Sequence, residues 1–485
     1  MVNGPGMGAT MHLPAEMPAH IRRATMSDKS REYIPGLIAG LHRGAIDRRA
    51  FMKRAAAAGL SASLIGQVVS RYDALAQDAS PSPVGAKATD AGAPGHQHNT
   101  ETGGGVIKLF SSWPLTGTYE QIGGDAVESI NLCLEDFGMA AGGFALEYEA
   151  LDDGTAANNG GPDAAKETEN VNRVVADVDC MVYMATYNSG MAKISIPITN
   201  GADMAQISYA NTYPGLTKVV PEVTEEGEPD VYYPSGKRNY MRVCPADDIQ
   251  GFAQAKWAYE SQGKRKAYVV HDQSLYGEGV ADLFRVYFQQ FGGEVLGFEG
   301  YDPDAGDYQS VMTSIADTGP DILVCGATVD NNPAKVLQDM RSVMGEEVMF
   351  LGPDGLINEA FVQGAGDAAE GAYLTFAGYS PDALVAQGGP GGDFVTRVTE
   401  RLGHSPDSYA VYGYECALVV IQTLDRVAAK DRAMILDDLF STEGFNSLLG
   451  LTWSFDENGD TDSTVIGLDV ITDGKITFVE LLPTT

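Results

Sequence analysis

The feature that most constrains the fold is an alternation of short, β-branched apolar runs with amphipathic stretches, which starts at residue 106. In a first series, strands are expected at residues 106–113, 144–151, 180–185 and 205–208. An acidic, aperiodic stretch at residues 221–237, expected to be a surface insertion, interrupts the pattern, and a second series starts at residue 240. Strands that alternate with helices favour parallel sheets with helices on both faces. The sequence therefore predicts two doubly wound, Rossmann-like α/β lobes.

The end of the chain has a different pattern, with strands expected at residues 449–455, 465–472 and 475–481. Asn458-Gly459 and Asp473-Gly474 lie between these strands, and both dipeptides are strong hairpin signals. A chain of 485 residues is too long for one core and suits two or three lobes. We assign residues 106–243 and 375–448 to lobe 1, and residues 244–374 and 449–485 to lobe 2.

Residues 1–76 carry the pattern of an export signal. The segment Asp47-Arg48-Arg49-Ala50-Phe51-Met52-Lys53 resembles the twin-arginine motif, and the apolar run at 55–69 is too short and too diluted to span a membrane. Ala74 and Ala76 supply the small residues expected before cleavage at Gln77, and no cysteine stands nearby for lipid attachment. We expect a periplasmic or extracellular protein exported by the twin-arginine route. The alternative is a basic amphipathic helix that is never cleaved.

Residues 77–105 are rich in Ala, Gly, Pro, Ser and Asp, a composition typical of a flexible linker. His96 and His98 stand in this stretch, with Gln97 between them. Two ligands on a flexible strand are too few for a metal site, so we expect both histidines to be exposed to solvent. We expect no metal and no cofactor.

The formal net charge is −34, and the first 76 residues are net positive, so the rest of the chain holds all of the excess acid. Such a body repels a phosphate backbone and an anionic membrane surface. We therefore expect no nucleic acid among its partners.

The five cysteines are scattered, and none forms a Cys-x-x-Cys pair that would support a structural zinc site. They are Cys133, Cys180, Cys244, Cys325 and Cys416. Most stand in apolar runs, which favours buried free thiols over disulfides, although one pair remains possible in an oxidising compartment.

The sequence contains few residues suited to catalysis. It has no Walker-type phosphate loop, no His-Glu-x-x-His and no Gly-x-Ser-x-Gly element. His271 precedes Asp272 at the end of an apolar run, but a neighbouring pair is not a catalytic triad without a nucleophile supplied by the fold. We expect a protein that is not an enzyme.

Three loops after expected strands are rich in small hydroxyl residues: residues 114–118, 185–190 and 208–214. Hydroxyl groups and free backbone N–H groups at a helix start suit a small anion such as a carboxylate. Each loop alone is better explained as a helix cap. Three at successive strand ends favour a binding site.

Five motifs occur in the order found in one protein family. They are Pro114-Leu115-Thr116-Gly117, the segment 207–217 with Ile207-Ser208 and Leu216-Thr217 at its ends, His271-Asp272-Gln273-Ser274-Leu275-Tyr276-Gly277, Leu351-Gly352-Pro353-Asp354-Gly355, and Phe455-Asp456-Glu457-Asn458-Gly459-Asp460. With these motifs, the chain from about residue 106 to 482 resembles the substrate-binding proteins of branched-chain amino-acid ABC transporters. The resemblance implies the type I periplasmic binding fold, in which two lobes are joined by a multi-strand hinge.

The resemblance also implies roles for single residues. Thr186 or Ser189, with Ala210 and Thr212, would hold the carboxylate and ammonium of an amino acid from lobe 1. From lobe 2, Tyr276 would close over the ligand and Asp354 would face its ammonium. Thr116 and Tyr119, in the first loop, complete the predicted ligand-binding set.

The chain departs from the family at two positions. Ile122 stands where the first loop often has an aromatic residue, with Tyr119 close by, and Val329-Asp330 stands where lobe 2 often has another. The extra carboxylate favours a more polar or cationic ligand.

We expect a monomer that closes on a small solute and delivers it to an ABC permease. The alternatives are an amide- or urea-binding protein of the same fold, a ligand-sensing receptor domain, and an α/β hydrolase or dehydrogenase.

Overall fold

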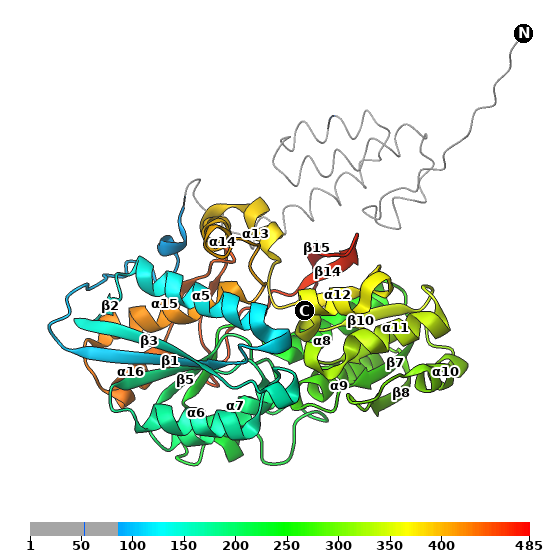
Figure 1. The fold of residues 1–485 in the computed structure, drawn as a ribbon, viewed down its shortest axis with the longest axis horizontal. Coiled ribbons are helices and arrows are strands. Elements are labelled where there is room, and N and C mark those ends of the chain that lie inside the picture. The colour runs from blue at the N-terminus through cyan, green and yellow to red at the C-terminus, as the bar shows by residue number, and fades with distance from the viewer. Residues whose placement is uncertain (1–52, 54–85) are drawn as a thin grey trace, which may run out of the picture. The chain divides into compact units, whose positions relative to one another are not determined.

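The computed structural model describes Lys53 and residues 86–485, and the latter form two α/β lobes (Figure 1). The arginine pair, the apolar run and the cleavage site of the predicted export signal lie outside the described residues. Within the part of the chain that is described, no helix is long and apolar enough to cross a membrane.

Lobe 1 is built on a six-stranded sheet with the strand order β2-β3-β1-β4-β5-β6. Its strands are β1 (Val106–Trp113), β2 (Ala140–Ala141), β3 (Phe144–Asp152), β4 (Cys180–Ala185), β5 (Ala205–Ser208) and β6 (Tyr240–Arg242). All neighbours pair in parallel except the edge strand β2, which runs antiparallel to β3. Every residue of β4 and β5 is buried, as expected for parallel strands covered by helices on both faces.

The helices of lobe 1 come from both halves of the chain. They are α5 (Glu120–Asp136), α6 (Ala164–Ala176), α7 (Ser189–Asn200), α13 (Pro381–Gln387), α14 (Gly389–Leu402), α15 (Ala410–Val427) and α16 (Arg432–Phe440). Residues 410–424 of α15 are all buried, so this helix forms much of the core. It crosses α5 closely at Gly413, where a Cβ atom would lie 2.9 Å from the Ala126 carbonyl oxygen.

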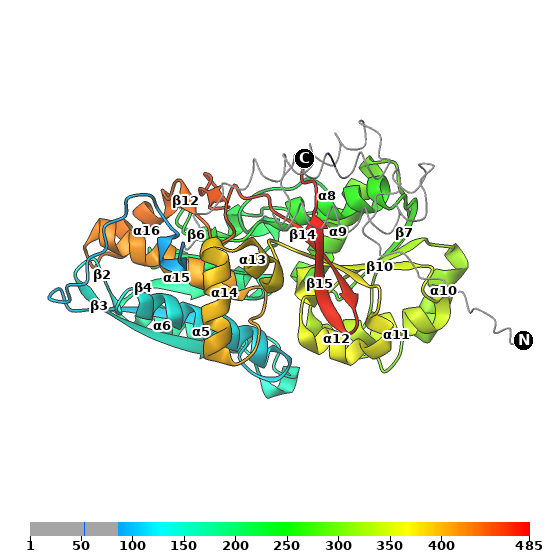
Figure 2. The ribbon, with the colours of Figure 1, turned by 90° about the horizontal axis from the view of Figure 1, so that it is seen from above.

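Lobe 2 is built on a seven-stranded sheet with the order β15-β14-β11-β10-β9-β7-β8. Its strands are β7 (Lys266–His271), β8 (Glu294–Gly300), β9 (Ile322–Gly326), β10 (Met349–Gly352), β11 (Tyr373–Phe376), β14 (Gly467–Thr472) and β15 (Lys475–Leu481). The hairpin β14–β15 is antiparallel and stands out in red in Figure 2. At its turn, Asp473 and Gly474 have φ angles of 52° and 69°, which confirms the predicted Asp-Gly turn.

Five helices cover the parallel part of this sheet: α8 (Asp247–Lys256), α9 (Leu275–Gln290), α10 (Gln309–Thr318), α11 (Pro333–Met344) and α12 (Glu359–Ala365). The structure therefore confirms the predicted pair of doubly wound α/β lobes. The repeated alternation of strands and helices was sufficient to predict this architecture.

The chain passes between the lobes after β6, after β11 and again before β14. Two of these passages are tied together by a buried ion pair, in which Arg242 Nε lies 2.7 Å from Asp460 Oδ1. The Arg242 guanidinium also donates to the carbonyl of Tyr213 at 2.9 Å. Asp460 thus links the late turn to the strand that leads out of lobe 1.

One predicted strand pairing is wrong. The strand expected at residues 449–455 is reduced to β13 (Thr452–Trp453), which pairs with β12 (Phe445–Asn446) instead of β14. The Asn458-Gly459 turn does form, but it closes only an isolated bridge between Phe455 and Thr461. Beside this bridge, the Asp460 side chain accepts a hydrogen bond from Arg242 Nε.

The prediction of a flexible linker is wrong for residues 86–99. Ala88 is fully buried and its N–H donates to Asp393 Oδ2 at 2.9 Å, and Gly92 N–H donates to the Asn446 carbonyl at 2.7 Å. His96 and His98 are not solvated side chains, because both hydrogen-bond to a buried carboxylate of α15. Composition failed here because Ala and Gly allow close packing against lobe 1 as readily as they allow flexibility.

The stretch at residues 221–237 is only partly a surface insertion. Tyr232 and Tyr233 are buried, and the Glu228 carboxylate accepts a hydrogen bond from Tyr213 Oη at 2.8 Å. The segment therefore braces the loop that follows β5.

All five cysteines are buried and unpaired, which confirms the expected free thiols. Burial raises the pKa of the Cys180 thiol to about 12, so its reactive thiolate form is disfavoured.

Candidate ligand site between the lobes

The strand order of each sheet fixes where a ligand site can form. In lobe 1, β1 is the central strand of the reversal, with β3 on one side of it in the sheet and β4 on the other. In lobe 2, β7 lies between β8 and β9 in the same way. Ligands of such sheets bind beyond the carboxyl ends of the strands next to this reversal. The loops after β1, β4 and β5 meet there with the loops after β7, β9 and β10.

Four tyrosines form a cluster where these loops meet: Tyr119, Tyr187, Tyr209 and Tyr409. The Tyr187 ring centroid lies 5.4 Å from that of Tyr119 and 5.4 Å from that of Tyr409, in edge-to-face geometry. Trp113, the last residue of β1, packs behind them with its ring 3.9 Å from Tyr209. We call this set of four the tyrosine cluster. It provides a rigid aromatic wall with polar hydroxyl groups.

Asp354 faces the tyrosine cluster from the loop after β10. Its Oδ1 accepts hydrogen bonds from Tyr276 Oη at 2.6 Å and from Gln250 Nε2 at 2.6 Å. Its Oδ2 accepts a hydrogen bond from the hydroxyl of Tyr409, at the start of α15. Burial raises the pKa of Asp354 above its ordinary value, and these hydrogen bonds offset part of the rise.

Two more carboxyl groups share this environment. Asp247, the first residue of α8, is fully buried, and burial together with the nearby charge of Asp354 raises its pKa well above the ordinary value. Asp330 accepts a hydrogen bond from Tyr119 Oη at 2.5 Å, and burial raises its pKa as well. We call Asp247, Asp330 and Asp354 the carboxylate group. Among the described residues, no lysine or arginine forms an ion pair with any of the three.

The contacts Tyr119–Asp330 and Tyr409–Asp354 join the two lobes directly. In both, a hydroxyl of lobe 1 donates to a carboxylate of lobe 2. The structure thus shows the lobes closed on each other at this point, with the site residues buried.

The lobe 1 loops are held in place by Asn211. Its side-chain nitrogen donates to the Tyr187 carbonyl at 2.8 Å, and its side-chain oxygen accepts from Tyr240 Oη at 3.0 Å. This amide therefore fixes the loop after β4 against the loop after β5. The spacing between Tyr187 and Tyr209 depends on it.

The structure brings three predicted residues into direct contact with this centre, namely Tyr119, Tyr276 and Asp354. Four other predicted residues of lobe 1 are buried in the adjoining loops, and all four have protein partners. Thr186 Oγ1 donates to the Asn188 carbonyl, Ser189 Oγ accepts from Tyr213 N–H, and Ala210 N–H donates to Ser208 Oγ; Thr212 is buried beside Asp247 N–H, which binds its carbonyl.

Thr116 lies apart from the others. It is exposed at the start of a short 3-10 turn, where its carbonyl accepts from Tyr119 N–H at 3.2 Å. The structure gives it the role of shaping the loop that carries Tyr119.

Sequence reasoning missed five residues of the centre: Tyr187, Tyr209, Tyr409, Asp247 and Gln250. Tyr187 and Tyr209 stand inside the hydroxyl-rich loops 185–190 and 208–214, so their signal in the sequence is an aromatic residue directly after a strand. Tyr409 follows β5 by about two hundred residues and starts a core helix, which leaves no local signal.

A groove of about 650 Å³ opens beside the site. Gly117, Thr118 and Gln121 line it from lobe 1, and Asn358, Glu359 and Gln363 line it from lobe 2. It borders the loop that carries Tyr119 into the centre. The groove therefore marks where the two lobes part towards solvent.

The neighbouring pair His271 and Asp272 has structural partners. The His271 ring stacks on Phe298 with centroids 4.8 Å apart, and burial lowers its pKa, which favours the neutral ring. The Asp272 carboxylate binds Ser274 Oγ at 2.6 Å and Asn331 Nδ2 at 2.7 Å, and so joins the loops after β7 and β9. These contacts hold the lobe 2 loops in register.

Comparison with known proteins agrees with the two-lobed fold. The family model described as periplasmic binding protein matches residues 107–475. A Leu/Ile/Val-binding protein homolog of Brucella melitensis is 24% identical over 274 residues, which are 56% of this chain and 67% of that protein. Among solved structures, a leucine-binding protein of Thermotoga maritima has a TM-score of 0.67 at 21% identity, covering 78% of this chain and 98% of its own. A solute-binding protein of an R. palustris ABC transporter, in complex with benzoate, has a TM-score of 0.62 at 19% identity and covers 78% and 96%. With a match over most of its length and this two-lobed fold, the chain belongs to the periplasmic binding protein family.

Proposed function

We propose that this protein is the solute-binding component of an ABC transporter and captures an amino-acid-like solute between its lobes. The relatives named above are substrate-binding proteins, and they support this class of function. The protein would close on its ligand, hold it without making or breaking a bond, and present it to a membrane permease.

The observation that carries the choice of ligand is the carboxylate group. Asp247 lies near Asp354, and Asp330 binds Tyr119 on the facing lobe; each of the three carboxyl groups has a raised pKa for which burial is the largest cause. Buried carboxylates without a cation are costly, whereas a ligand ammonium placed among them would compensate their charge. The site therefore favours a solute that carries an ammonium group.

The tyrosine cluster would supply the other half of recognition. Its rings offer a flat apolar surface for a side chain, and an ammonium near a ring face gains further from the π electrons. A carboxylate of the ligand would lie towards the start of α7, where Ser189 begins the helix and its N-terminal N–H groups favour an anion.

An amide or urea remains the second candidate. Asp354 already accepts from two hydroxyls and one side-chain amide, so the site is built to receive neutral O–H and N–H donors. A ligand amide could replace one of these donors.

The family implies a periplasmic or extracellular place for the protein. We further propose that the Arg48-Arg49 segment directs export by the twin-arginine route, that the mature protein is a monomer, and that it has no catalytic activity. These points extend the sequence pattern and need their own tests, beginning with replacement of both arginines by lysine and measurement of export.

The proposed function is tested by thermal-shift screening of the purified protein against amino acids, acetamide, urea and benzoate. Binding to the folded state raises the melting temperature by mass action. We expect at least one amino acid to give a saturable shift. A shift with acetamide or urea alone would favour the second candidate, and no shift with any amino acid or amide would contradict the function.

A further inference from the structure

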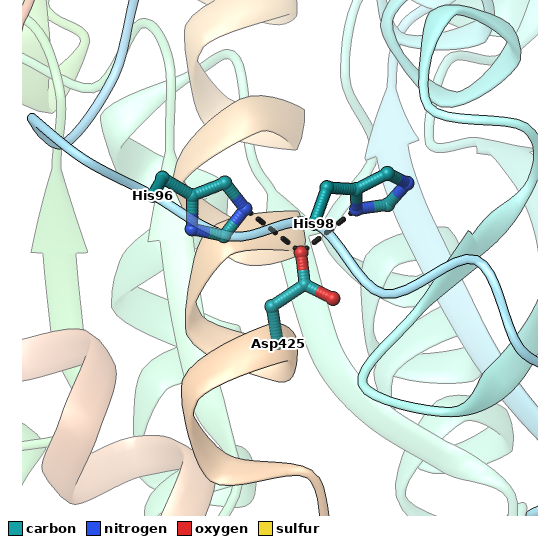
Figure 3. Close-up of side chains that lie close together, drawn as sticks. All are labelled: His96, His98 and Asp425. Atoms are coloured by element: carbon teal, nitrogen blue, oxygen red, sulfur yellow. Dashed lines mark hydrogen bonds and ion pairs between the residues drawn. The ribbon is translucent and has the colours of Figure 1, made fainter.

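A second constellation of side chains lies in lobe 1, outside the ligand site. His96 Nε2 and His98 Nδ1 each lie 2.8 Å from the same oxygen, Oδ2 of Asp425 (Figure 3). The three ligand atoms lie within 4.8 Å of one another. His96 and His98 come from the N-terminal segment and Asp425 from the last turn of α15, so the fold unites residues more than 320 positions apart.

Each member of this triad is held by other contacts. The second oxygen of Asp425 accepts hydrogen bonds from Gly142 N–H at 2.7 Å and from Asn99 N–H at 3.1 Å. The His98 Nε2 atom lies 2.9 Å from the Phe137 carbonyl, and the His98 ring packs edge-on against the Phe137 ring. Histidines that bind metals usually donate their other N–H to a carbonyl or carboxylate, which fixes the ring.

The three side chains are more buried than those of a surface ion pair. Asp425 is 1% exposed, and His96 and His98 are 10% and 19% exposed. The carboxylate is thus shielded, while the histidine edges leave a path from solvent for a small ion and for one water ligand.

The ring orientations leave two nitrogen atoms for an ion. Because a carbonyl oxygen only accepts, His98 Nε2 is the donor towards Phe137, and Nδ1 is the ring nitrogen that faces the carboxylate. At His96, Nε2 faces the same carboxylate oxygen. Metal binding displaces to solvent any proton that these two nitrogens carry, so both become ligands.

We propose that His96, His98 and Asp425 form a binding site for a divalent transition-metal ion of the zinc type, with a water as fourth ligand. Two imidazole nitrogens and one carboxylate oxygen are a preferred ligand set for zinc. The ligand atoms around tetrahedral zinc lie roughly 3.3 Å apart, given bonds of about 2.0–2.1 Å. The two 2.8 Å nitrogen–oxygen contacts therefore need to widen by about half an ångström to admit the ion, and the two nitrogens, now within 4.8 Å of each other, need to adopt the same spacing.

The ion would fasten the N-terminal segment to the core of lobe 1. That segment already contacts α15 through Ala93 N–H, which donates to Gln422 Oε1 at 2.8 Å. The triad adds the next point of attachment along the same helix. Metal binding at this site would stabilise the folded protein by mass action.

The proposed metal site is separate from the ligand site. Tyr409 precedes the first turn of α15 and Asp425 lies near its end, about 24 Å away along the axis at about 1.5 Å per residue. The metal proposal is therefore independent of the proposed function.

The test is calorimetric titration of zinc chloride into the purified, chelator-treated protein, compared with the double variant His96→Ala/His98→Ala and with Asp425→Asn. We expect one ion per chain at this site, with affinity reduced at least about 10-fold in both variants. His404→Ala is the matched control, since His404 also binds a carboxylate, that of Asp125 at 3.0 Å, but has no second histidine beside it. It should bind zinc like the unchanged protein.

Asp425→Asn retains an oxygen that can accept from Asn99 and Gly142, so it should keep the fold. If Asp425→Asn unfolds, the single variant His96→Ala tests the proposal in its place, because His96→Ala removes one ligand and only one hydrogen bond. Zinc should also raise the melting temperature of the unchanged protein and not that of the variants. Equal zinc affinity in unchanged protein and double variant, or no zinc binding by the unchanged protein, would overturn the proposal.

Discussion

The two lobes contribute opposite chemistry to the site between them. Lobe 1 presents the tyrosine cluster, with the buried Asp407 beside Tyr409, whereas lobe 2 presents the carboxylate group. The hydrogen bonds Tyr119–Asp330 and Tyr409–Asp354 both run in one direction, from a lobe 1 hydroxyl to a lobe 2 carboxylate. Lobe 1 therefore supplies shape and contact area, and lobe 2 supplies the charge that selects the ligand.

This difference between the lobes explains how the same carboxylates can bind tyrosine hydroxyls in the ligand-free protein and an ammonium group in the complex. Tyrosine hydroxyls are neutral hydrogen-bond donors. An ammonium group binds a carboxylate more strongly than a hydroxyl does, so a ligand ammonium can displace a tyrosine hydroxyl from the carboxylate. The variants below separate the two contributions, beginning with the lobe 2 charge.

Removing the central charge of lobe 2 should have the largest effect. Asp354→Ala should weaken binding of the ligand found by screening by roughly 100-fold, since loss of one partner from a buried charge pair costs a few kcal/mol. Calorimetry measures this, with Asp317→Ala as control because Asp317 is an exposed carboxylate of the same lobe. Unchanged affinity in Asp354→Ala would place the charge recognition elsewhere.

Removing contact area from lobe 1 should have a smaller effect. Tyr187→Ala should weaken binding about 10-fold, because its ring touches both Tyr119 and Tyr409 and would also contact the ligand. Tyr187→Phe keeps the ring and should bind within a few-fold of the unchanged protein by the same titration. If Tyr187→Phe is as weak as Tyr187→Ala, the hydroxyl and not the ring is the important part.

Breaking one contact between the lobes should have a modest effect. Tyr119→Phe removes the hydrogen bond to Asp330 and should lower affinity about 3- to 10-fold by destabilising the closed state. Tyr148→Phe is the control, because its hydroxyl bonds Ser111 at 2.7 Å within lobe 1. Small-angle scattering should show a more open ligand-free protein for Tyr119→Phe alone; equal scattering from both variants would argue against the role of this bond in closure.

Changing the pH should have the smallest effect. It acts on buried carboxyl groups of both lobes, since burial also raises the pKa of Asp407, next to Tyr409 in lobe 1, to about 7. The raised pKa of Asp354 means that it takes up a proton at a higher pH than an ordinary aspartate, while the pKa of Tyr187 is raised by burial and the phenol stays neutral. Affinity for an ammonium ligand should therefore fall as the pH is lowered from about pH 8 to about pH 5. Asp354→Asn should flatten this dependence, and an affinity that increases towards acid would contradict the assignment.

The stability of the ligand-free protein should depend on pH with the opposite sign. A carboxyl whose pKa is raised by folding stabilises the folded state below its unfolded pKa of about 4, and this contribution is lost as the pH rises through the folded value. Asp354→Asn should thus improve ligand-free stability more at about pH 8 than at about pH 5, as measured by urea denaturation.

The sequence predicted best those strands whose bounds are determined by a single local signal. Strands β4, β5 and β15 were predicted at their observed bounds, because buried apolar runs and an Asp-Gly turn are local signals. Strand β14 begins at Gly467, two residues after the expected start at residue 465, and ends at the expected residue.

The site was predictable only in part, because it depends on contacts between distant segments. Asp354 and Tyr276 stand in motifs that can be recognised, but their partner Tyr409 immediately precedes a core helix whose sequence resembles any buried helix. His96 and His98 show the same limit, as their partner Asp425 follows more than 320 residues later. Tertiary partners of this kind become visible only once the fold is known.

The central claim is that the lobe 2 carboxylates select a solute with an ammonium group. The most direct test is calorimetry of the purified protein with an amino acid identified by screening and with its matched carboxylic acid that lacks the amino group. The account predicts that the amino acid binds at least about 100-fold more tightly, because only it compensates the buried carboxylates. Equal or tighter binding of the acid without the amino group, or of benzoate, would contradict it.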